Sequence, residues 1–288
     1  MKKYLVLGSS GMLGRQLLKE AQKRDLYASG AACSEGTLPN IEDTEAFENF
    51  LQESSPDVII NTVALTDLIQ CEVNPERAYA VNARPANVLA RYCKQQRRTG
   101  KDVYLVQIST DQFWTDQKNW AHTESEGPVD LLNEYAASKF TAENFARTDP
   151  CSLVVRTNIA GPRNITWFLD ALQCEMPITL WSQHWVSTID IYSFAEALFD
   201  ILKLWPTGVL NLASREVCTK REFFEELTEK LSPAFRNFNY HDGPVVQSVR
   251  RAESCGLCVD KAEQILGRKL PTRQEVVRRL VEEVYASF

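Results

Sequence analysis

Short apolar runs alternate with amphipathic segments through the first half of the chain. Four runs are apolar on both faces and are typical of buried strands: residues 3–8, 56–64, 102–110 and 152–157. A weaker strand is predicted over residues 25–30. Strands of this kind, separated by helices, form a parallel sheet that is covered on both sides. The pattern therefore predicts an α/β fold with a doubly wound, Rossmann-like parallel sheet.

Apolar residues at helical spacing predict the helices between these strands. One helix covers residues 11–24, a second covers 44–53, and a long one follows over 75–95. Proline lacks an amide hydrogen and its ring clashes with the preceding turn, so Pro85 should bend or break the long helix.

The alternation loosens beyond residue 157. Helices are predicted near 191–204, 219–231 and 273–288, with a strand over 208–214 and an irregular stretch up to residue 258. We therefore expect residues 1–157 to form the Rossmann domain. Residues 158–288 should form a smaller α+β lobe, with the chain crossing between the two.

Composition and charge exclude several classes of protein. Of 288 residues, 44% are hydrophobic and 24% are charged, which is typical of a soluble globular protein. The net charge of −6 argues against nucleic acid as a partner, because binding to phosphates needs a basic surface. There is no run of about 18 apolar residues, so no membrane span is expected. Glycines interrupt the first apolar run, which favours a buried strand over an export signal.

Eight cysteines without an export signal indicate reduced thiols and a cytoplasmic protein. Cys255 and Cys258 have the C-x-x-C spacing of zinc and redox sites. Zinc would need two more ligands, and the chain has no second C-x-x-C and no H-x-x-x-H. A structural role for the pair is favoured, and no metal is expected.

A glycine-rich turn follows the first strand. Gly8, Gly11 and Gly14 have G-x-x-G-x-x-G spacing between that strand and the first helix. Glycines allow a close approach of backbone to phosphate, and the helix N-terminus attracts negative charge, so the turn predicts dinucleotide binding. NAD sites usually carry an acidic residue after the second strand, but here the first one is Glu35. No arginine follows the strand either, and on balance the sequence favours NADPH, with NADH as the alternative.

Three polar residues suit the reduction of a ketone. Tyr135 and Lys139 are four residues apart and would share one helix face, where the ammonium would lower the pKa of the phenol. Thr110 ends the predicted strand 102–110, at the edge where open α/β sheets bind ligands. Tyr135 could then donate a proton while Thr110 hydrogen-bonds the carbonyl. Taken alone, the tyrosine and lysine would more often be packing residues; the glycine turn favours catalysis.

These features together resemble the extended short-chain dehydrogenase/reductase superfamily and, within it, the dTDP-4-dehydrorhamnose reductase family. The matching stretches cover nearly the whole chain in order. They are PDVIINTVALT, CEVNPERAYAVNA, ISTDQF, LNEYAASKFTAE, VVRT, SQHWVST, GVLNLAS, RRAESCGL and LGRKLPTRQEVVRRLV.

The resemblance implies an NAD(P)H-dependent oxidoreductase that reduces the 4-keto group of a nucleotide-linked 6-deoxy sugar, in the biosynthesis of dTDP-L-rhamnose or a related deoxysugar for a polysaccharide. The catalytic residues would be Thr110, Tyr135 and Lys139. The implied cofactor contacts are Gly8, Gly11, Met12, Leu13, Gly14, Asn40, Ile41, Thr62, Val63, Ala64, Tyr135, Lys139 and Thr157. The implied substrate contacts are Thr66, Asp111, Gln112, Trp185 and Arg251.

Departures from the family pattern cluster where the sugar would bind. Gln112 replaces an aromatic residue, and the segment after Arg156 is shortened and lacks two aromatics. Trp185 stands in place of a glycine, flanked by Ser182 and Ser187 in place of Asp and Pro. Such changes alter pocket volume and hydrogen bonding, so the identity of the sugar stays open. Arg251 could bind the substrate diphosphate or be a surface charge.

Two alternatives remain at this point. One is a non-catalytic nucleotide-binding protein resembling the regulatory subunit of methionine adenosyltransferase, against which the intact Thr110, Tyr135 and Lys139 argue. The other is a sugar-nucleotide epimerase or dehydratase on the same scaffold. Dehydratases typically carry an acidic pair after the catalytic hydroxyl, whereas here Asp111 is followed by Gln112. A homodimer is also left open.

Overall fold

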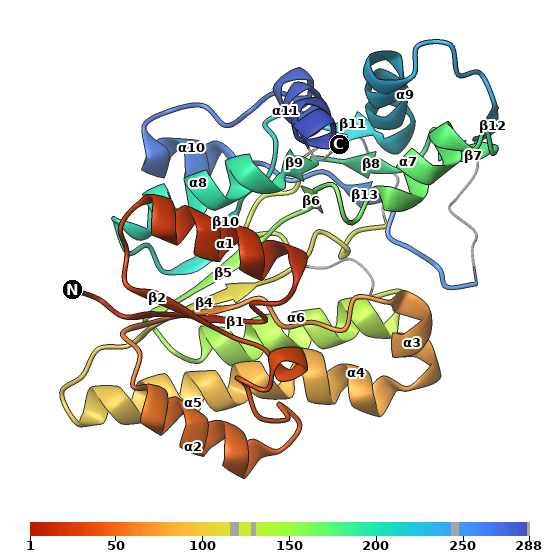
Figure 1. Cartoon of the computed structure of the whole chain (residues 1–288). Helices are drawn as coiled ribbons and strands as arrows, with labels where there is room; N and C mark the ends of the chain where they lie inside the picture. Colours follow the sequence, from red (N-terminus) through yellow and green to blue (C-terminus); the bar gives the residue numbers. More distant parts are fainter. Residues whose placement is uncertain (116–120, 128–130, 243–247, 287–288) are drawn as a thin grey trace. The chain divides into compact units, whose positions relative to one another are not determined.

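The computed structural model describes residues 1–115, 121–127, 131–242 and 248–286 (Figure 1). The described residues divide into two compact units. The first unit contains Met1–Thr110, Leu132–Arg156 and Phe199–Leu210. The second contains the described residues of Asp111–Leu131, Thr157–Leu198 and Asn211–Phe288. Each unit is therefore assembled from three separate segments of the chain.

A six-stranded sheet forms the centre of the first unit, with strand order β10-β5-β4-β3-β1-β2. Its strands are β1 (Tyr4–Leu7), β2 (Ala28–Ala31), β3 (Val58–Asn61), β4 (Tyr104–Ile108), β5 (Ser152–Arg156) and β10 (Gly208–Asn211). Neighbours among β1 to β5 pair in parallel, so that Val6 lies between Gly30 and Ile60. Every residue of β1, β3, β4 and β5 is buried. The predicted parallel sheet is confirmed.

The helices of the first unit cover both faces of this sheet. They are α1 (Met12–Lys23), α2 (Thr44–Ser54), α3 (Leu68–Val73), α4 (Pro75–Asn82), α5 (Arg84–Arg98) and α6 (Glu134–Arg147). In Figure 1, α1 lies on one face, and α2, α4, α5 and α6 lie along the other. The break predicted near Pro85 occurs at Ala83, between α4 and α5. Helix α3 was not predicted, because its six residues are too few for a clear period.

Strand β10 departs from the sequence-based expectation. Its residues were expected in the second lobe, yet the strand is hydrogen-bonded beside β5 at the edge of the main sheet. Val209 and Leu210 are buried there, at 9% and 0% exposure. An apolar run of this length shows that a strand is buried but not which sheet it joins.

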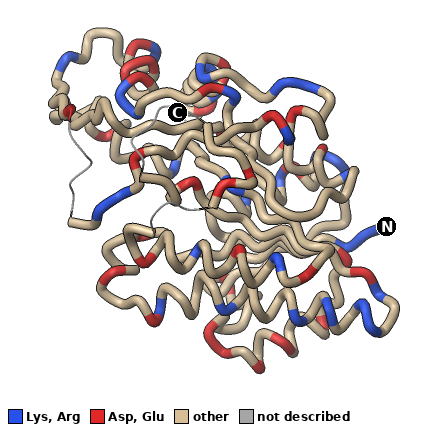
Figure 2. Tube along the Cα trace, turned by 180° about the vertical axis from the view of Figure 1, so that it is seen from behind, with Lys and Arg blue, Asp and Glu red and all other residues tan. Residues whose placement is uncertain are grey.

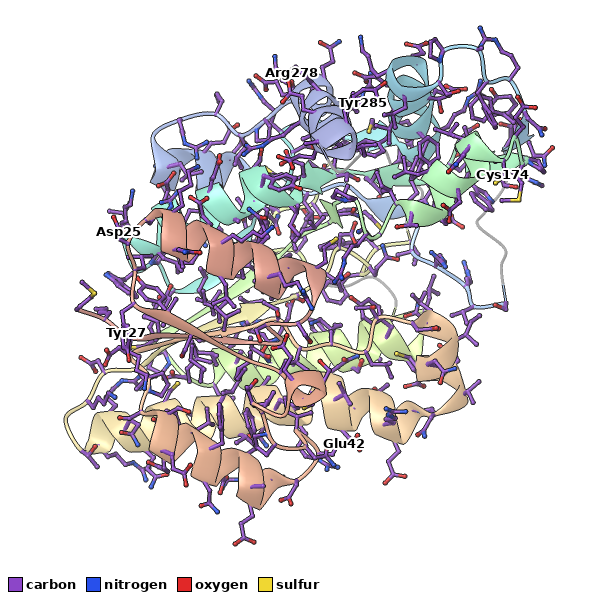
Figure 3. The ribbon with its side chains drawn as sticks, viewed as in Figure 1. Asp25, Tyr27, Glu42, Cys174, Arg278 and Tyr285 are labelled. Carbon is purple, nitrogen blue, oxygen red and sulfur yellow. The ribbon has the colours of Figure 1, made fainter. Side chains whose placement is uncertain are left out.

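Local backbone conformation sets the turn between α1 and β2. Asp25 has a φ of 53°, in the left-handed region that lets the chain reverse directly after the helix. Tyr27 follows with an exposed side chain (Figure 3). A short 3-10 helix, η1 (Cys33–Glu35), comes after β2.

The second unit is built from short strands and helices. Its strands form three small sheets: β11 (Cys218–Thr219), β8 (Trp185–Val186) and β13 (Ser254–Cys255); β12 (Phe238–His241) and β7 (Ile178–Trp181); β6 (Ile159–Ala160) and β9 (Ile189–Asp190). Its helices are α7 (Thr166–Gln173), α9 (Lys220–Leu231), α10 (Asp260–Leu266) and α11 (Arg273–Ala286), together with most of α8 (Ile191–Leu202). The stretch expected to be irregular up to residue 258 thus contains β12 and β13. Both strands are too short to show an alternating pattern.

Each unit has its own apolar core. In the first, Leu7, Phe47, Leu51 and Ile59 belong to a cluster with no exposed surface on these side chains. In the second, helices α7, α9 and α11 pack through Phe168, Leu227 and Val276. In Figure 2, acidic and basic positions are interspersed along the trace. Among the described residues, no helix is long and apolar enough to span a membrane.

Candidate active site

The glycine turn brings backbone segments into close contact. Gly8 has a φ of +81°, and a Cβ placed on it would lie 2.7 Å from Thr62 Oγ1. A Cβ on Gly14 would lie 2.3 Å from the carbonyl oxygen of Gly8. Thr62 Oγ1 itself donates a hydrogen bond to the Leu7 carbonyl at 2.7 Å. Only glycine fits at these two positions without displacing backbone.

The same turn leads into α1. Gly11 is the N-cap residue, in an extended conformation, and no side chain caps the helix. The first amides of a helix have no acceptor within it and carry a partial positive charge. Met12 and Leu13 provide such amides directly after the close-packed turn. This cradle fits a pyrophosphate, and hence the dinucleotide that the sequence predicts.

Other predicted cofactor contacts lie at the carboxyl ends of the strands. Thr62, Val63 and Ala64 follow β3, and Asn61 Oδ1 accepts a hydrogen bond from the Val63 amide at 3.2 Å. Asn40 is exposed and closes a local turn by accepting from the Glu42 amide at 3.1 Å. Ile41 is only 5% exposed and belongs to the apolar core of the first unit. Contacts of these residues with a cofactor stay predictions.

Helix α6 carries the predicted tyrosine and lysine. Asn133 caps it by accepting from the Ala136 amide at 2.8 Å, which starts the helix just before Tyr135. Tyr135 is partly buried and stands one turn before Lys139 on the same face. Lys139 is 3% exposed, and its Nζ donates to the Ile108 carbonyl at 2.7 Å.

The contact at Ile108 brings α6 to the end of β4. Thr110 follows two residues later and is 5% exposed. The structure thus places Lys139 at the strand end that carries Thr110, with Tyr135 one turn away. Burial lowers the pKa of Lys139 to about 8, while the negative charge of Glu143 acts in the opposite direction. A lysine in this state supports a nearby phenolate and can exchange a proton near neutral pH.

A buried ion pair joins Glu143 on α6 to Arg156 at the end of β5. Glu143, one turn after Lys139 on α6, accepts from Ser109 Oγ at 2.6 Å and from Arg156 Nη2 at 2.9 Å. Arg156 is 2% exposed and Glu143 is fully buried. Ser109 directly precedes Thr110, so these three residues tie α6 to the ends of β4 and β5.

Asn82 is a supporting residue that the sequence reasoning missed. It is fully buried at the end of α4, and its Nδ2 donates to Ser138 Oγ on α6 at 2.9 Å. Its Oδ1 accepts from the Leu65 amide at 2.6 Å, and its Nδ2 also donates to the Leu65 carbonyl at 3.1 Å. Asn82 therefore fixes the segment after β3 against the helix of Tyr135. The sequence does offer one indication of this role: Asn82 is a polar amide among apolar residues of the helix predicted over 75–95.

The second unit contains a cavity of about 660 Å³. Its wall combines polar and cationic groups with aromatic rings. The lining residues are Asn158, Ile159, Ala160, Asn164, Ile165, Trp167, Ala171, Pro177, Ile178, Thr179, Leu180, Trp181, His184, Thr188, Lys220, Phe223, Phe224 and Arg251. A volume of this size, with apolar walls and a few polar groups, is typical of a small-molecule pocket.

Two cations and a buried imidazole set the charge of this cavity. Burial lowers the pKa of His184 well below its usual value, and Lys220 and Arg251 add to the effect, so the ring is neutral. Burial also lowers the pKa of Lys220, with Arg251 as a further cause. His184 Nε2 and Arg251 Nε are buried without a hydrogen-bond partner among the described residues.

The remaining predicted substrate residues have different environments. Asp111 is 2% exposed and accepts from Asn158 Nδ2 at 2.5 Å and from Gln112 Nε2 at 3.0 Å, and burial raises the pKa of its carboxyl. Trp185 pairs with Thr219 and Ser254 in the three-stranded sheet. The structure thus brings Arg251 to the cavity directly, and Asp111 to it through Asn158.

Thr66 and Thr157 are the last two predicted positions. Thr66 is exposed in the first unit, in the segment between β3 and α3. Thr157 is 6% exposed at the start of a segment of the second unit, and its Oγ1 has no partner among the described residues. Their roles in binding stay predictions.

Within the described residues, Cys255 and Cys258 are not joined by a disulfide. All eight cysteines are free thiols; Cys255 is buried, Cys258 is partly buried, and Cys174 is exposed at the end of α7 (Figure 3). Cys255 Sγ lies 3.3 Å from Gln112 Nε2, and burial raises the pKa of the thiol. Among the described residues, no three His, Cys, Asp or Glu side chains are placed to hold a metal. A structural role remains the better interpretation of the pair.

A parallel sheet with a glycine turn after its first strand, and a tyrosine-lysine helix at its carboxyl edge, defines a nucleotide-binding α/β protein of the extended short-chain dehydrogenase/reductase class. Residues 1–286 match the model of the family described as RmlD substrate binding domain. The chain belongs to this family.

Individual relatives are similar over most of the chain. It is 26% identical over 241 residues to the Haloferax volcanii protein named "Probable low-salt glycan biosynthesis reductase Agl14", covering 78% of each chain. A dTDP-4-dehydrorhamnose reductase from Clostridium acetobutylicum has the same fold, with a TM-score of 0.86, 20% identity and 99% coverage of both chains. The Bacillus anthracis enzyme of that name, solved in complex with NADP, has a TM-score of 0.84 and 20% identity over 98% of this chain and 99% of its own.

Proposed function

We propose that the chain is an NAD(P)H-dependent reductase of the 4-keto group of a nucleotide-linked 6-deoxy sugar. The observation that carries this proposal is the hydrogen bond from Lys139 Nζ to the Ile108 carbonyl, which holds the lysine at the strand end bearing Thr110. The names of the Haloferax and Clostridium relatives, both reductases, support the same reaction class.

Proton transfer is assigned to Tyr135. A bound NADPH or NADH would supply the hydride, and the oxygen of the ketone must then gain a proton. Lys139 favours the phenolate of Tyr135 by its positive charge and so lowers the cost of releasing that proton. Thr110 would hydrogen-bond the ketone oxygen and orient it. These three residues supply orientation and acid catalysis.

The cavity of the second unit is assigned to the nucleotide diphosphate of the substrate. Arg251 and Lys220 provide positive charge, and the neutral His184 can donate or accept a hydrogen bond. The aromatic residues Trp167 and Phe224 supply apolar surface for a base or sugar ring. Because cationic groups and aromatic rings line the same cavity, a nucleotide sugar fits better than a simple sugar.

The test is the oxidation of NADPH and of NADH by the purified protein in the presence of nucleotide-linked 4-keto-6-deoxy sugars, beginning with the dTDP form. We expect loss of the reduced nicotinamide absorbance and a 6-deoxy sugar nucleotide as product. The matched control is Tyr135→Phe, which should bind cofactor but turn over at least about a hundredfold more slowly. An inactive wild-type protein that binds a partner protein instead would reject the proposal.

The free thiols also support a cytoplasmic location.

A further inference from the structure

The segment after β2 packs directly against the glycine turn. The amides of Gly8 and Ser9 both donate to the Ala31 carbonyl, at 2.8 and 3.2 Å. A Cβ on Gly30 would lie 2.5 Å from the Cβ of Ser9. Ser34 Oγ then donates to Ser10 Oγ at 2.8 Å. As a result, the 3-10 helix Cys33–Glu35 borders the turn that cradles the pyrophosphate.

Two opposite charges meet at this border. Glu35 Oε2 accepts from Ser9 Oγ at 3.3 Å, and Glu35 Oε1 lies 3.9 Å from Arg15 Nη2. Arg15 comes from the start of α1, and its Nε donates to the Ser10 carbonyl at 2.8 Å. The side chains of Arg15 and Glu35 are 54% and 46% exposed, so both can meet a ligand. Arg15 supplies the cation that the sequence after β2 lacks.

The position of this pair corresponds to the adenosine ribose of a dinucleotide. In this type of fold, the residue after the second strand contacts the ribose, where a carboxylate accepts from the 2′-hydroxyl and an arginine accommodates a 2′-phosphate. NADH and NADPH differ only at the 2′ position of this ribose, which carries a hydroxyl in NADH and a phosphate in NADPH. Glu35 would therefore repel the phosphate of NADPH, and Arg15 would attract it.

We propose that Glu35 and Arg15 together set the cofactor selectivity of this chain, and that their opposed charges let it accept both NADPH and NADH. This inference rests on the proposed function, because it concerns the cofactor of that reaction. Removing either charge should change the ratio of the affinities for NADP⁺ and NAD⁺. Glu35→Gln should favour NADP⁺, and Arg15→Gln should favour NAD⁺.

The test is calorimetric titration of the purified full chain with NADP⁺ and with NAD⁺, which needs no sugar substrate. We expect Glu35→Gln to tighten NADP⁺ binding by about tenfold and to weaken NAD⁺ binding a few-fold, as for one exposed charge a few ångströms from a phosphate. Arg15→Gln should weaken NADP⁺ binding by about tenfold and leave NAD⁺ within about twofold. Higher salt should shrink both effects.

The matched controls are Glu48→Gln and Arg91→Gln. These residues form a 3.2 Å surface ion pair between α2 and α5, with exposures of 40% and 63%, and should leave both affinities unchanged. If wild type binds both dinucleotides but neither test variant changes their ratio, the inference is wrong and the proposed function stands. If wild type binds neither dinucleotide, both fail.

Discussion

Arg156, at the end of β5, donates two hydrogen bonds to the carboxylate of Glu143. Its Nε lies 3.1 Å from Oε1, and its Nη2 lies 2.9 Å from Oε2. Both side chains are buried, so each charge depends on the other for compensation. Ser109 Oγ also donates a hydrogen bond to Glu143 Oε1. The pair holds α6 to the two strands that end beside it, and Lys139 lies one turn before Glu143.

The first prediction concerns this ion pair. Glu143→Gln keeps the shape of the side chain but leaves Arg156 as an uncompensated buried charge. We expect the free energy of unfolding to fall by about 2–4 kcal/mol, measured by urea denaturation. The control is Glu48→Gln, an exposed partner of Arg91, which should cost less than about 1 kcal/mol. Equal stability of the two variants would contradict a supporting role for the pair.

Tyr135→Phe tests proton transfer. Removing the phenol oxygen should lower the turnover number by a factor of about 10² or more, the usual scale for the loss of a general acid. Cofactor affinity, measured by calorimetry, should stay nearly intact because the ring is kept. A rate within a few-fold of wild type would show that another group donates the proton.

The depressed pKa of Lys139 predicts a dependence of stability on pH. The folded protein releases this proton at about pH 8, whereas an unfolded lysine keeps it to about pH 10.5. Between these values the unfolded state binds more protons, so the unfolding free energy should rise with pH, by about 2 kcal/mol from pH 7 to pH 10. Lys139→Met should lack this rise. The comparison is the wild-type minus Lys139→Met difference in urea denaturation at each pH, and a flat difference would contradict the predicted shift.

Gly14→Ala tests the packing of the glycine turn. The added methyl group would meet the Gly8 carbonyl oxygen at 2.3 Å, so the turn must open. We expect at least about a tenfold loss in dinucleotide affinity and a loss of stability of about 1–3 kcal/mol. Gly127→Ala is the control, because nothing lies within 4 Å of a Cβ at that position.

Arg251→Gln tests the cavity of the second unit. Losing the charge should raise the KM for the nucleotide sugar by about tenfold, the scale of one charge-assisted hydrogen bond to phosphate. The KM for NADPH should not change. The pKa of His184 should also rise, since Arg251 helps to lower it, and NMR titration of the imidazole would measure this change. An unchanged KM for the sugar would place the diphosphate elsewhere.

The sequence predicted the fold well where the signal was local. The first strand, the glycine turn and the break near Pro85 follow from periodicity and backbone chemistry, and all three are confirmed. Helix α3 and strand β13 were missed because their periods are too short to detect.

Contacts between distant residues could not be predicted in this way. Arg15 forms an ion pair with Glu35, twenty positions later in the chain. Asn82 on α4 donates a hydrogen bond to Ser138 on α6. The grouping of His184, Lys220 and Arg251 in one cavity also depends on three separate segments of the chain. A single sequence shows which side chains can do chemistry, but only the folded chain shows which of them are neighbours.

The edge position of β10 has a consequence for synthesis and truncation. The main sheet takes its last strand from residues 208–211, more than fifty positions after β5. A nascent chain that has emerged only as far as β5 would leave the backbone groups of that strand open to pairing with other chains. Fragments that stop before residue 211 should therefore aggregate, and a shortened version for expression should retain this late strand.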